Sequence, residues 1–203
     1  MNLLLAGPPG VGKSTIGRLC AERLDYTFID IDEKIVARAR TSISEIFAQQ
    51  GEAAFRVLER EAVEKAVAQD GRVIALGGGA LLDRNNRRLA TTTGPVVCLR
   101  AREESIRTRL GASRERPLLD EEKGGAALRT LLGERAAHYD SFALQLQTDR
   151  LTPEAAAECI VAELMPWQST VQTTSGGHKL LLGTCARTYL PRLLRDHQLP
   201  QPE

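Results

Sequence analysis

The residues whose types and spacing could do chemistry lie near the amino terminus, in the stretch Gly7-Pro8-Pro9-Gly10-Val11-Gly12-Lys13-Ser14. This order of glycine, four residues, glycine, lysine and serine is typical of a phosphate-binding loop. Glycine tolerates positive φ, so Gly10 and Gly12 can bring backbone N–H groups close to phosphate oxygens. The Lys13 ammonium can reach terminal phosphates, and the Ser14 hydroxyl is a hard oxygen ligand suited to Mg²⁺. The alternative is a chance glycine turn ahead of a helix.

The segments on both sides of this loop are those that a phosphate loop requires. Leu3-Leu4-Leu5-Ala6 is an uninterrupted apolar run, which predicts a strand buried on both faces. After the loop, apolar residues recur at helical spacing: Ile16, Leu19, Cys20 and Leu24. Strand, loop and helix therefore follow in the expected order.

A pair of carboxylates follows the next predicted strand, Tyr26-Thr27-Phe28-Ile29. Alternate residues of a strand share a face, so Asp30 and Asp32 can point the same way. An acidic residue at the end of a strand beside a phosphate loop is the usual second Mg²⁺ contact, which leaves Asp32 to meet a substrate hydroxyl. The alternative is that both residues cap the next helix, which we expect to begin near Glu33.

The next segments predict two helices, a third strand and a glycine run. Ser42-Ile43-Ser44-Glu45 fits a capping box for a short helix through Gln50, and Gly51 separates it from a helix over residues 52–69. Arg56 and Glu59 stand one turn apart there, as an ordinary surface pair also would. Strand 73–76 runs into Gly77-Gly78-Gly79, where ligands bind in open α/β sheets. A flexible turn is the alternative.

The second half of the core continues the alternation of helices and strands. We expect helices over 84–90, 102–110, 126–139 and from Pro153 to about Met165, a fourth strand over 96–99 and an edge strand over 144–148. Residues 111–125 lack apolar periodicity and predict a charged lid that contains Arg116. Five strands alternating with helices indicate a parallel α/β sheet.

Composition restricts the class of protein. The chain has 203 residues, of which 42% are hydrophobic and 26% charged, and its formal charge is +1, which gives no electrostatic case for nucleic acid or membrane. The four cysteines are widely spaced, which favours neither disulfides nor zinc, and we expect Cys20 and Cys98 on apolar faces. Met1 runs directly into the first strand, so we expect no signal peptide and a cytoplasmic protein.

Together these motifs resemble those of the shikimate kinases, from Met1 to about Met165. The resemblance is carried by the phosphate loop through Arg18, Asp30-Ile31-Asp32, Gly51-Glu52 with Phe55-Arg56 and Glu59, Leu76-Gly77-Gly78-Gly79-Ala80, Arg116-Pro117-Leu118-Leu119, and Glu134-Arg135-Ala136 with Tyr139. Many kinases share the loop, whereas the last three motifs are more specific. The family commonly has Pro-Leu before the tyrosine where this chain has Ala137-His138, and we interpret His138 as a surface substitution.

The resemblance implies a three-layer P-loop kinase fold of the nucleoside-monophosphate-kinase type. Its five-stranded parallel sheet would have the order 2-3-1-4-5, with a lid over about residues 111–125. The implied reaction transfers the γ-phosphate of ATP to the 3-hydroxyl of shikimate, with Mg²⁺ as cofactor. We expect a monomer whose partners are these two small molecules.

The resemblance also implies a role for each site residue. The catalytic residues would be Lys13, Asp32 and Arg116, with Asp32 holding the reacting hydroxyl and acting as base. Shikimate would contact Asp32, Arg56, Gly78, Gly79 and Arg135, and the two arginines would clamp its carboxylate. ATP would contact Gly10, Val11, Gly12, Lys13, Ser14, Thr15, Arg109, Arg116 and Pro153, with Arg109 and the Pro153 region around adenine. Mg²⁺ would be held by Ser14 and, through water, by Asp30.

Two other functions remain open from the residues. Another small-molecule kinase, acting on gluconate or a nucleoside monophosphate, would share the loop and lid but would not need the triple glycine with Arg56 and Arg135. A non-catalytic nucleotide-binding relative would be expected to have lost Lys13, Asp32 or Arg116, and all three are present.

Residues 166–203 form a C-terminal extension to a kinase domain of residues 1–165. Residues 168–175 and 179–183 predict two strands, Gly176-Gly177 a turn between them, and residues 189–197 a short helix. The segment loosely resembles the opening of 3-dehydroquinate synthase, which suggests a remnant of a fused enzyme. A poorly ordered extension is the alternative.

Overall fold

A computed structural model of the chain describes residues 1–111, 121–164, 167–173 and 176–182, with side chains described within 1–111 and 125–164. By its internal contacts the chain divides into two units, Met1–Ala157 and Glu158–Glu203. The first unit contains the phosphate loop and a five-stranded sheet, and the second contains a two-stranded sheet.

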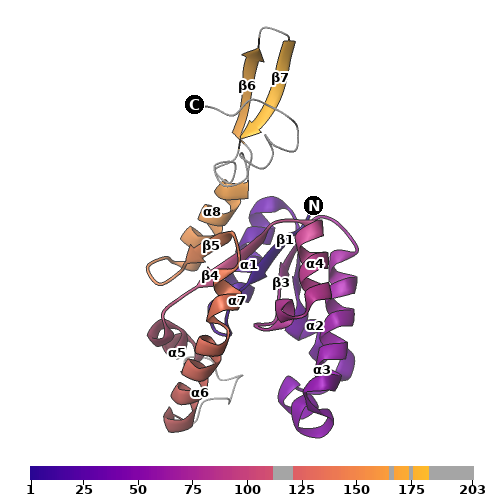
Figure 1. Cartoon of the computed structure of the whole chain (residues 1–203), viewed down its shortest axis with the longest axis vertical. Coiled ribbons are helices and arrows are strands. Elements are labelled where there is room, and N and C mark those ends of the chain that lie inside the picture. The colour runs from indigo at the N-terminus through magenta and orange to yellow at the C-terminus, as the bar shows by residue number, and fades with distance from the viewer. Residues whose placement is uncertain (112–120, 165–166, 174–175, 183–203) are drawn as a thin grey trace. The chain divides into compact units, whose positions relative to one another are not determined.

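The centre of the first unit is a parallel sheet in the order β2-β3-β1-β4-β5 (Figure 1). Its strands are β1 (Leu3–Ala6), β2 (Thr27–Asp30), β3 (Arg72–Ala75), β4 (Val96–Arg100) and β5 (Leu144–Gln147), and all neighbours pair in parallel. Every residue of β1 is buried, as its apolar run predicts, and β5 lies at one edge with alternating exposure. The predicted sheet and its strand order are confirmed.

Helices cover both faces of this sheet and give the predicted three layers. The helices of the described chain are α1 (Lys13–Leu24), α2 (Ile31–Ala39), α3 (Ile43–Val67), α4 (Arg84–Thr93), α5 (Glu103–Gly111), α6 (Glu121–Glu134), α7 (Ala136–Asp140) and α8 (Pro153–Leu164), with a 3₁₀ turn at Ala80–Leu82. Figure 1 shows α2, α3 and α4 together on one side. Leu4, Ile74 and Cys98 belong to the core with these helices. On the opposite face, Gly17 of α1 lies against Leu5 and Phe28.

Several predicted boundaries are wrong for local reasons. Helix α2 begins at Ile31, not near Glu33, so Asp32 lies in its first turn rather than on a strand, because the Asp30 carboxylate caps the helix. Helix α3 has the predicted Ser42–Glu45 capping box, and the expected break at Gly51 is a kink with φ 78° and ψ 174°.

The segment predicted as a lid and the helix after it also differ from expectation. Helix α6 starts at Glu121, so the last part of residues 111–125 is helical and includes Gly124 and Gly125. The predicted helix 126–139 is divided at Arg135, whose φ of −103° and ψ of 5° separate α6 from α7. Arg116 lies outside the described residues.

The second unit contains an antiparallel pair, β6 (Trp167–Thr173) with β7 (Gly176–Leu182). The two predicted strands are present, but the predicted turn at Gly176-Gly177 is wrong. These glycines pair with Thr173 and Gln172 and so extend the ladder of β7. The predicted helix over residues 189–197 lies outside the described residues. In the described part of the chain, no helix has the length and apolar character needed to cross a membrane.

Candidate active site

The phosphate loop joins β1 to α1, and its glycines adopt the positive φ values that the motif requires. Gly7, Gly10 and Gly12 have φ of 132°, 74° and 104°, values that side chains rarely tolerate. A Cβ atom on Gly10 would also lie 2.6 Å from Leu110 Cγ. Lys13 Nζ donates hydrogen bonds to the carbonyl oxygens of Gly7 and Pro8, at 2.9 and 2.8 Å. The loop thus presents an ammonium and a helix N-terminus, which together attract anions.

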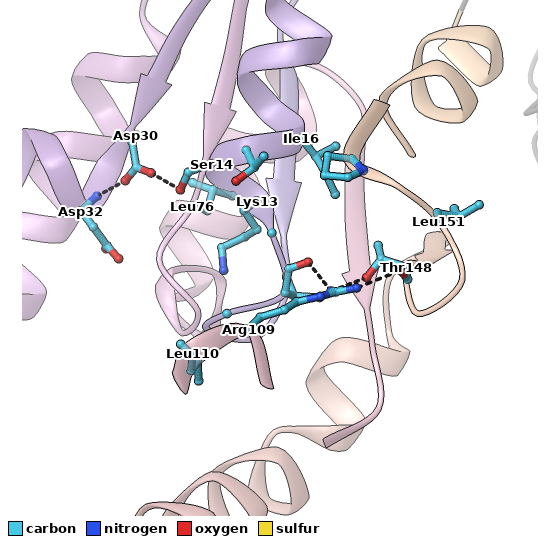
Figure 2. Close-up of a pocket in the computed structure, with 15 residues that line it drawn as sticks. Lys13, Ser14, Ile16, Asp30, Asp32, Leu76, Arg109, Leu110, Thr148 and Leu151 are labelled. Carbon is cyan, nitrogen blue, oxygen red and sulfur yellow. Dashed lines mark hydrogen bonds between the residues drawn. The ribbon is translucent and has the colours of Figure 1, made fainter. Parts of the chain in front are cut away.

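A serine and a carboxylate meet at the start of α1 (Figure 2). Ser14 Oγ donates to Asp30 Oδ2 at 2.6 Å, while Asp30 Oδ1 accepts from the backbone N–H groups of Asp32 and Glu33, at 2.9 and 3.3 Å. Asp30 therefore caps α2, as one interpretation predicts, and it also faces the phosphate loop, so a role as a Mg²⁺ contact stays a prediction. Two hard oxygen donors beside a phosphate loop fit Mg²⁺, which takes few protein ligands and completes its shell with water and phosphate.

Two cavities adjoin the phosphate loop. The larger one, of about 470 Å³, opens over the loop. All the described residues predicted to contact ATP line it: Gly10, Val11, Gly12, Lys13, Ser14, Thr15, Arg109 and Pro153. Figure 2 shows Arg109 reaching across the cavity toward Thr148. Its guanidinium donates to Val11 O at 3.1 Å and to Thr148 Oγ1 and O, both at 2.9 Å. These bonds fix the guanidinium plane beside the loop.

Sequence reasoning missed several residues that line this cavity, namely Ile16, Leu76, Leu110, Thr148 and Leu151. Thr148 is buried and follows β5, where its backbone N–H and its hydroxyl both bond to Arg100 O. Apolar residues and a single threonine carry no motif. The position of Thr148 at the carboxyl end of a parallel strand is the signal that could have identified it.

A smaller cavity of about 160 Å³ adjoins the other end of the loop. It is lined by Pro9, Lys13, Asp32, Ile43, Phe47, Phe55, Arg56, Glu59, Gly77, Gly78, Gly79 and Arg135. The structure thus brings together every residue predicted to contact shikimate. Lys13 and Asp32 line both cavities. A group bound in one cavity can therefore meet a group bound in the other at these two side chains.

The charged wall of the smaller cavity centres on a buried glutamate. Arg56 Nη1 donates to Glu59 Oε2 at 2.7 Å, and Arg56 Nε and Nη2 donate to Glu52 Oε1 at 3.1 and 2.9 Å. Glu59 is only 2% exposed, so the interpretation as an ordinary surface pair is wrong. Burial raises the pKa of the Glu59 carboxyl, while the Arg56 guanidinium acts to lower it. Glu59 therefore holds Arg56 in place at the cavity wall.

The triple glycine leaves room for this charged cluster. A Cβ atom on Gly77 would lie 2.7 Å from Glu59 Oε1 and 3.1 Å from Asp32 Oδ1, and one on Gly79 would lie 3.1 Å from an Arg135 nitrogen. Tyr139, which is buried on α7, donates through its hydroxyl to Gly78 O at 2.8 Å. The run is thus held against the site, in agreement with the prediction of backbone close to a ligand.

Two other expectations from the sequence have different outcomes. The prediction that Cys20 and Cys98 face the core is confirmed: both are buried, and burial raises each thiol pKa to about 11. The interpretation of His138 as a surface substitution is wrong, because its ring packs edge-on to Phe142 at 5.2 Å and is partly buried. Burial lowers the pKa of the His138 imidazole, and the nearby Arg87 and Arg135 act in the same direction.

A phosphate loop at the end of the central strand, a carboxylate beside its serine and a second cavity that shares its lysine define a small-molecule kinase of the P-loop class. Comparison with known sequences agrees with this class. A sequence model of the family described as shikimate kinase matches residues 9–165. Shikimate kinase from Xanthomonas axonopodis pv. citri (strain 306) is 40% identical over 169 residues, which cover 82% of this chain and 94% of the relative. The chain therefore belongs to the shikimate kinase family of ATP-dependent kinases.

Solved structures agree with this assignment. Shikimate kinase from Acinetobacter baumannii, solved in complex with shikimate, has a TM-score of 0.75 and 32% identity, covering 80% of this chain and 92% of that one. A gluconokinase from Sinorhizobium meliloti 1021 has a TM-score of 0.54 at 18% identity, covering 80% and 92%. The gluconokinase shares the fold alone, so it gives no support to gluconate as the substrate.

Proposed function

We propose that this chain transfers the γ-phosphate of ATP to the 3-hydroxyl of shikimate, with Mg²⁺ bound beside the phosphates. The observation that carries the proposal is the pair of cavities that share Lys13 and Asp32. ATP occupies the larger cavity, and shikimate occupies the smaller one. Its hydroxyl oxygen attacks the γ-phosphorus, the bond to the bridging oxygen breaks, and ADP leaves.

The loop binds the nucleotide and balances charge. Backbone N–H groups at Gly10 and Gly12 bind the phosphates, and the Lys13 ammonium exchanges its carbonyl partners for phosphate oxygens as ATP enters. The Arg109 guanidinium, held by Thr148, packs against the adenine opposite Pro153. Arg116, which lies outside the described residues, adds a cation when the lid closes, because phosphoryl transfer depends on positioning and charge neutralisation.

Ser14 and Asp30 form the proposed Mg²⁺ site. Their oxygens are 2.6 Å apart, and Asp30 is oriented by the first N–H groups of α2. Ser14 and Asp30 would hold Mg²⁺, and the ion would supply positive charge against that of the nucleotide phosphates. Among the described residues, no group of three or more His, Cys, Asp or Glu could hold a metal. A site with two protein oxygens is typical of kinases, where the phosphates supply further ligands.

The walls of the smaller cavity match a small carboxylate with hydroxyl groups. Arg56 of α3 and Arg135, at the junction of α6 and α7, both lie close to Gly79, so their guanidinium groups can bind one carboxylate from both sides. Asp32 lies near Gly77, where it can accept the proton from the reacting hydroxyl. Gluconate also carries a carboxylate, which is why substrate choice needs a direct test.

The test is an ADP-release assay, coupled to NADH oxidation, with shikimate, gluconate and AMP as acceptors. We expect Mg-dependent turnover with shikimate and none above background with the other two. Turnover with gluconate or with AMP, and none with shikimate, would show that the chain phosphorylates a different acceptor. The absence of turnover with all three acceptors, while ATP still binds, would favour the non-catalytic alternative.

We also propose that the chain acts as a monomer with residues 1–165 as its kinase domain. The described residues of this chain line two adjoining cavities whose chemistry fits both substrates, which supports a site formed within one chain. Sedimentation during turnover should give the mass of a single chain. Activity that rises faster than enzyme concentration would indicate an active oligomer.

A further inference from the structure

A third cavity of about 320 Å³ lies apart from the phosphate loop, between α2, α3 and the β2 edge of the sheet. Its floor is apolar and its rim is basic, and we call it the basic groove. The floor consists of Ile29, Ile35, Leu58, Ala62 and Ala66. The rim consists of Lys34, Arg38, Lys65 and Arg72. None of these residues lines the two cavities assigned to ATP and shikimate.

The floor lies at the margin of the hydrophobic core and is only partly open to water. Ile35 and Ala66 are buried, at 1% and 4% exposure, while Ile29, Leu58 and Ala62 pack on the same core and are only partly buried. An apolar ligand body placed here would remove this surface from water, which is favourable in proportion to the area covered. The volume is at the lower end of the range for small-molecule sites.

The rim carries positive charge that its own contacts do not fully balance. Arg38 pairs with Glu61, and Arg72 donates to Lys65 O, Ala66 O and the Gln69 side chain. Lys34 and Lys65 are exposed, and neither forms an ion pair within the described part of the chain. The sequence has only five lysines, so two of them beside one groove are a marked concentration.

The two helices that form the groove also carry the charged wall of the shikimate cavity. Asp32 lies in the first turn of α2, one turn before Ile35. On α3, Glu59 lies between Leu58 and Ala62, and Arg56 is one turn earlier. A ligand that bridges α2 and α3 in the groove would therefore contact the same two helices that carry Asp32, Arg56 and Glu59.

We propose that the basic groove is an effector site for a small organic anion with an apolar body. The anionic group meets Lys34 and Lys65 at the rim, and the apolar body covers the floor. Occupancy changes the affinity for shikimate through α2 and α3, a coupling that rests on the proposed function. Because such coupling is reciprocal, shikimate must change the affinity of the groove for its ligand by the same factor.

The first experiment measures binding with a probe of this chemistry. The probe is 8-anilinonaphthalene-1-sulfonate, and its uncharged counterpart N-phenyl-1-naphthylamine has the same rings without the sulfonate. Both are titrated by fluorescence into the full chain with Mg·ADP and shikimate at saturation, so that the other two cavities are filled. We expect saturable binding of one sulfonate probe per chain.

Three variants locate the probe. The double variant Lys34→Gln/Lys65→Gln should weaken binding of the sulfonate by about tenfold, because it removes two charge contacts near the surface. It should leave the uncharged probe unchanged. The matched control Arg84→Gln/Arg88→Gln removes two exposed charges from α4 and should leave the affinity for both probes unchanged. Ala62→Trp fills the floor and should abolish binding of both, with shikimate kinase activity and the melting temperature as checks of folding.

The second experiment measures coupling, as the sulfonate dissociation constant with and without shikimate at saturating Mg·ADP. We expect a change of about fivefold or more, the lower end of typical allosteric coupling. No saturable binding, or equal weakening by both double variants, overturns the site. An unchanged dissociation constant in a chain that phosphorylates shikimate normally overturns the effector role. Binding as expected in a chain that does not phosphorylate shikimate contradicts the proposed function and supports the groove as a separate binding site.

Discussion

Asp32 is the residue whose proposed role depends most on proton transfer. It lines both cavities, and its Oδ1 lies close to Gly77 at the end of β3. Asp32→Asn keeps the shape of the side chain and its hydrogen bonding but cannot accept the proton of a hydroxyl. We expect nearly complete loss of phosphoryl transfer with Mg·ATP binding largely intact, measured by kcat and by nucleotide titration.

The control for this prediction is Glu33→Gln, in the same turn of α2. Glu33 is exposed and pairs with Arg18, and it lines neither cavity. This variant should retain wild-type kcat. If Asp32→Asn also transfers phosphate at the wild-type rate, Asp32 only positions the substrate and the proposed base is wrong.

Arg56 is expected to contribute to substrate affinity. Its guanidinium is held by Glu59 and Glu52 at the wall of the smaller cavity. Removal of one charge-assisted partner costs about 2–5 kcal/mol, so Arg56→Ala should raise the KM for shikimate by roughly 30-fold or more. The KM for ATP should change little. Arg60→Ala, one turn away and paired with Asp83 instead, is the matched control. A shikimate KM within about twofold of wild type would remove Arg56 from the site.

Glu59 should make stability depend on pH in a direction opposite to that of most carboxylates. Burial raises its folded pKa above the ordinary value of 4.5. Just above pH 4.5 the folded protein retains a proton that the unfolded chain releases, so the free energy of unfolding falls as pH rises through this window. Glu59→Gln lacks this contribution. Urea unfolding from pH 4 upward gives the free energy of unfolding of the wild-type protein and of Glu59→Gln. As pH rises, this free energy should fall more for the wild-type protein than for the variant. Parallel pH curves for the two proteins would contradict the raised pKa of Glu59.

Residue types and spacing were enough to predict the phosphate loop and the glycine run after the third strand, whereas Arg56 and Arg135 were singled out by the resemblance to the shikimate kinases. Residue types and spacing were not enough for Glu59 or Thr148. An arginine and a glutamate three residues apart look the same on a surface helix and in a site, because the burial of Glu59 depends on β3, which lies far from it in sequence. Only the folded sheet brings these segments together.

Helix α2 shows why element boundaries were harder to predict than element types. Its start is set by the Asp30 carboxylate, which accepts from two N–H groups, and the same carboxylate bonds to Ser14 of α1. A strand ending in Asp-Ile-Asp fits both an extended and a capped backbone, so the sequence left the two alternatives open. Helix α6 is similar, since Gly124 and Gly125 lie in its first turns despite the low helix propensity of glycine.

The lid gives a prediction that concerns a whole segment. Arg116 is expected to reach the transferring phosphoryl group only when the lid closes, so its charge is needed more in the transition state than in the ground state. Arg116→Ala should therefore lower kcat much more than it weakens binding of either substrate, measured by steady-state kinetics and nucleotide titration. Arg114→Ala removes the same charge from the same segment and is the control. An unchanged kcat for Arg116→Ala would mean that this arginine is only a surface residue.

For the molecule as a whole, sequence comparison and internal contacts place the end of the kinase domain at similar positions in the chain. The family match ends at residue 165, and the first compact unit ends at Ala157, within α8. Among the residues whose side chains the structure describes, those that line the two cavities all lie at or before Pro153, so we expect the proposed reaction to require no residue of β6 or β7. The most direct test of this division is truncation.

The last prediction therefore concerns residues 166–203. A chain that ends after Met165 or Pro166 keeps α8 and both cavities and loses the β6–β7 pair, and a two-stranded hairpin adds little stability by itself. We expect shikimate kinase activity and the thermal midpoint to remain essentially unchanged. Light proteolysis of the full chain should remove the tail first, because local opening there costs less than opening of the sheet core. This result would fit either interpretation of the tail, as a remnant of a fused enzyme or as a simple extension. An inactive or aggregating truncated protein would instead mean that the tail packs on the kinase core, and both interpretations would be wrong.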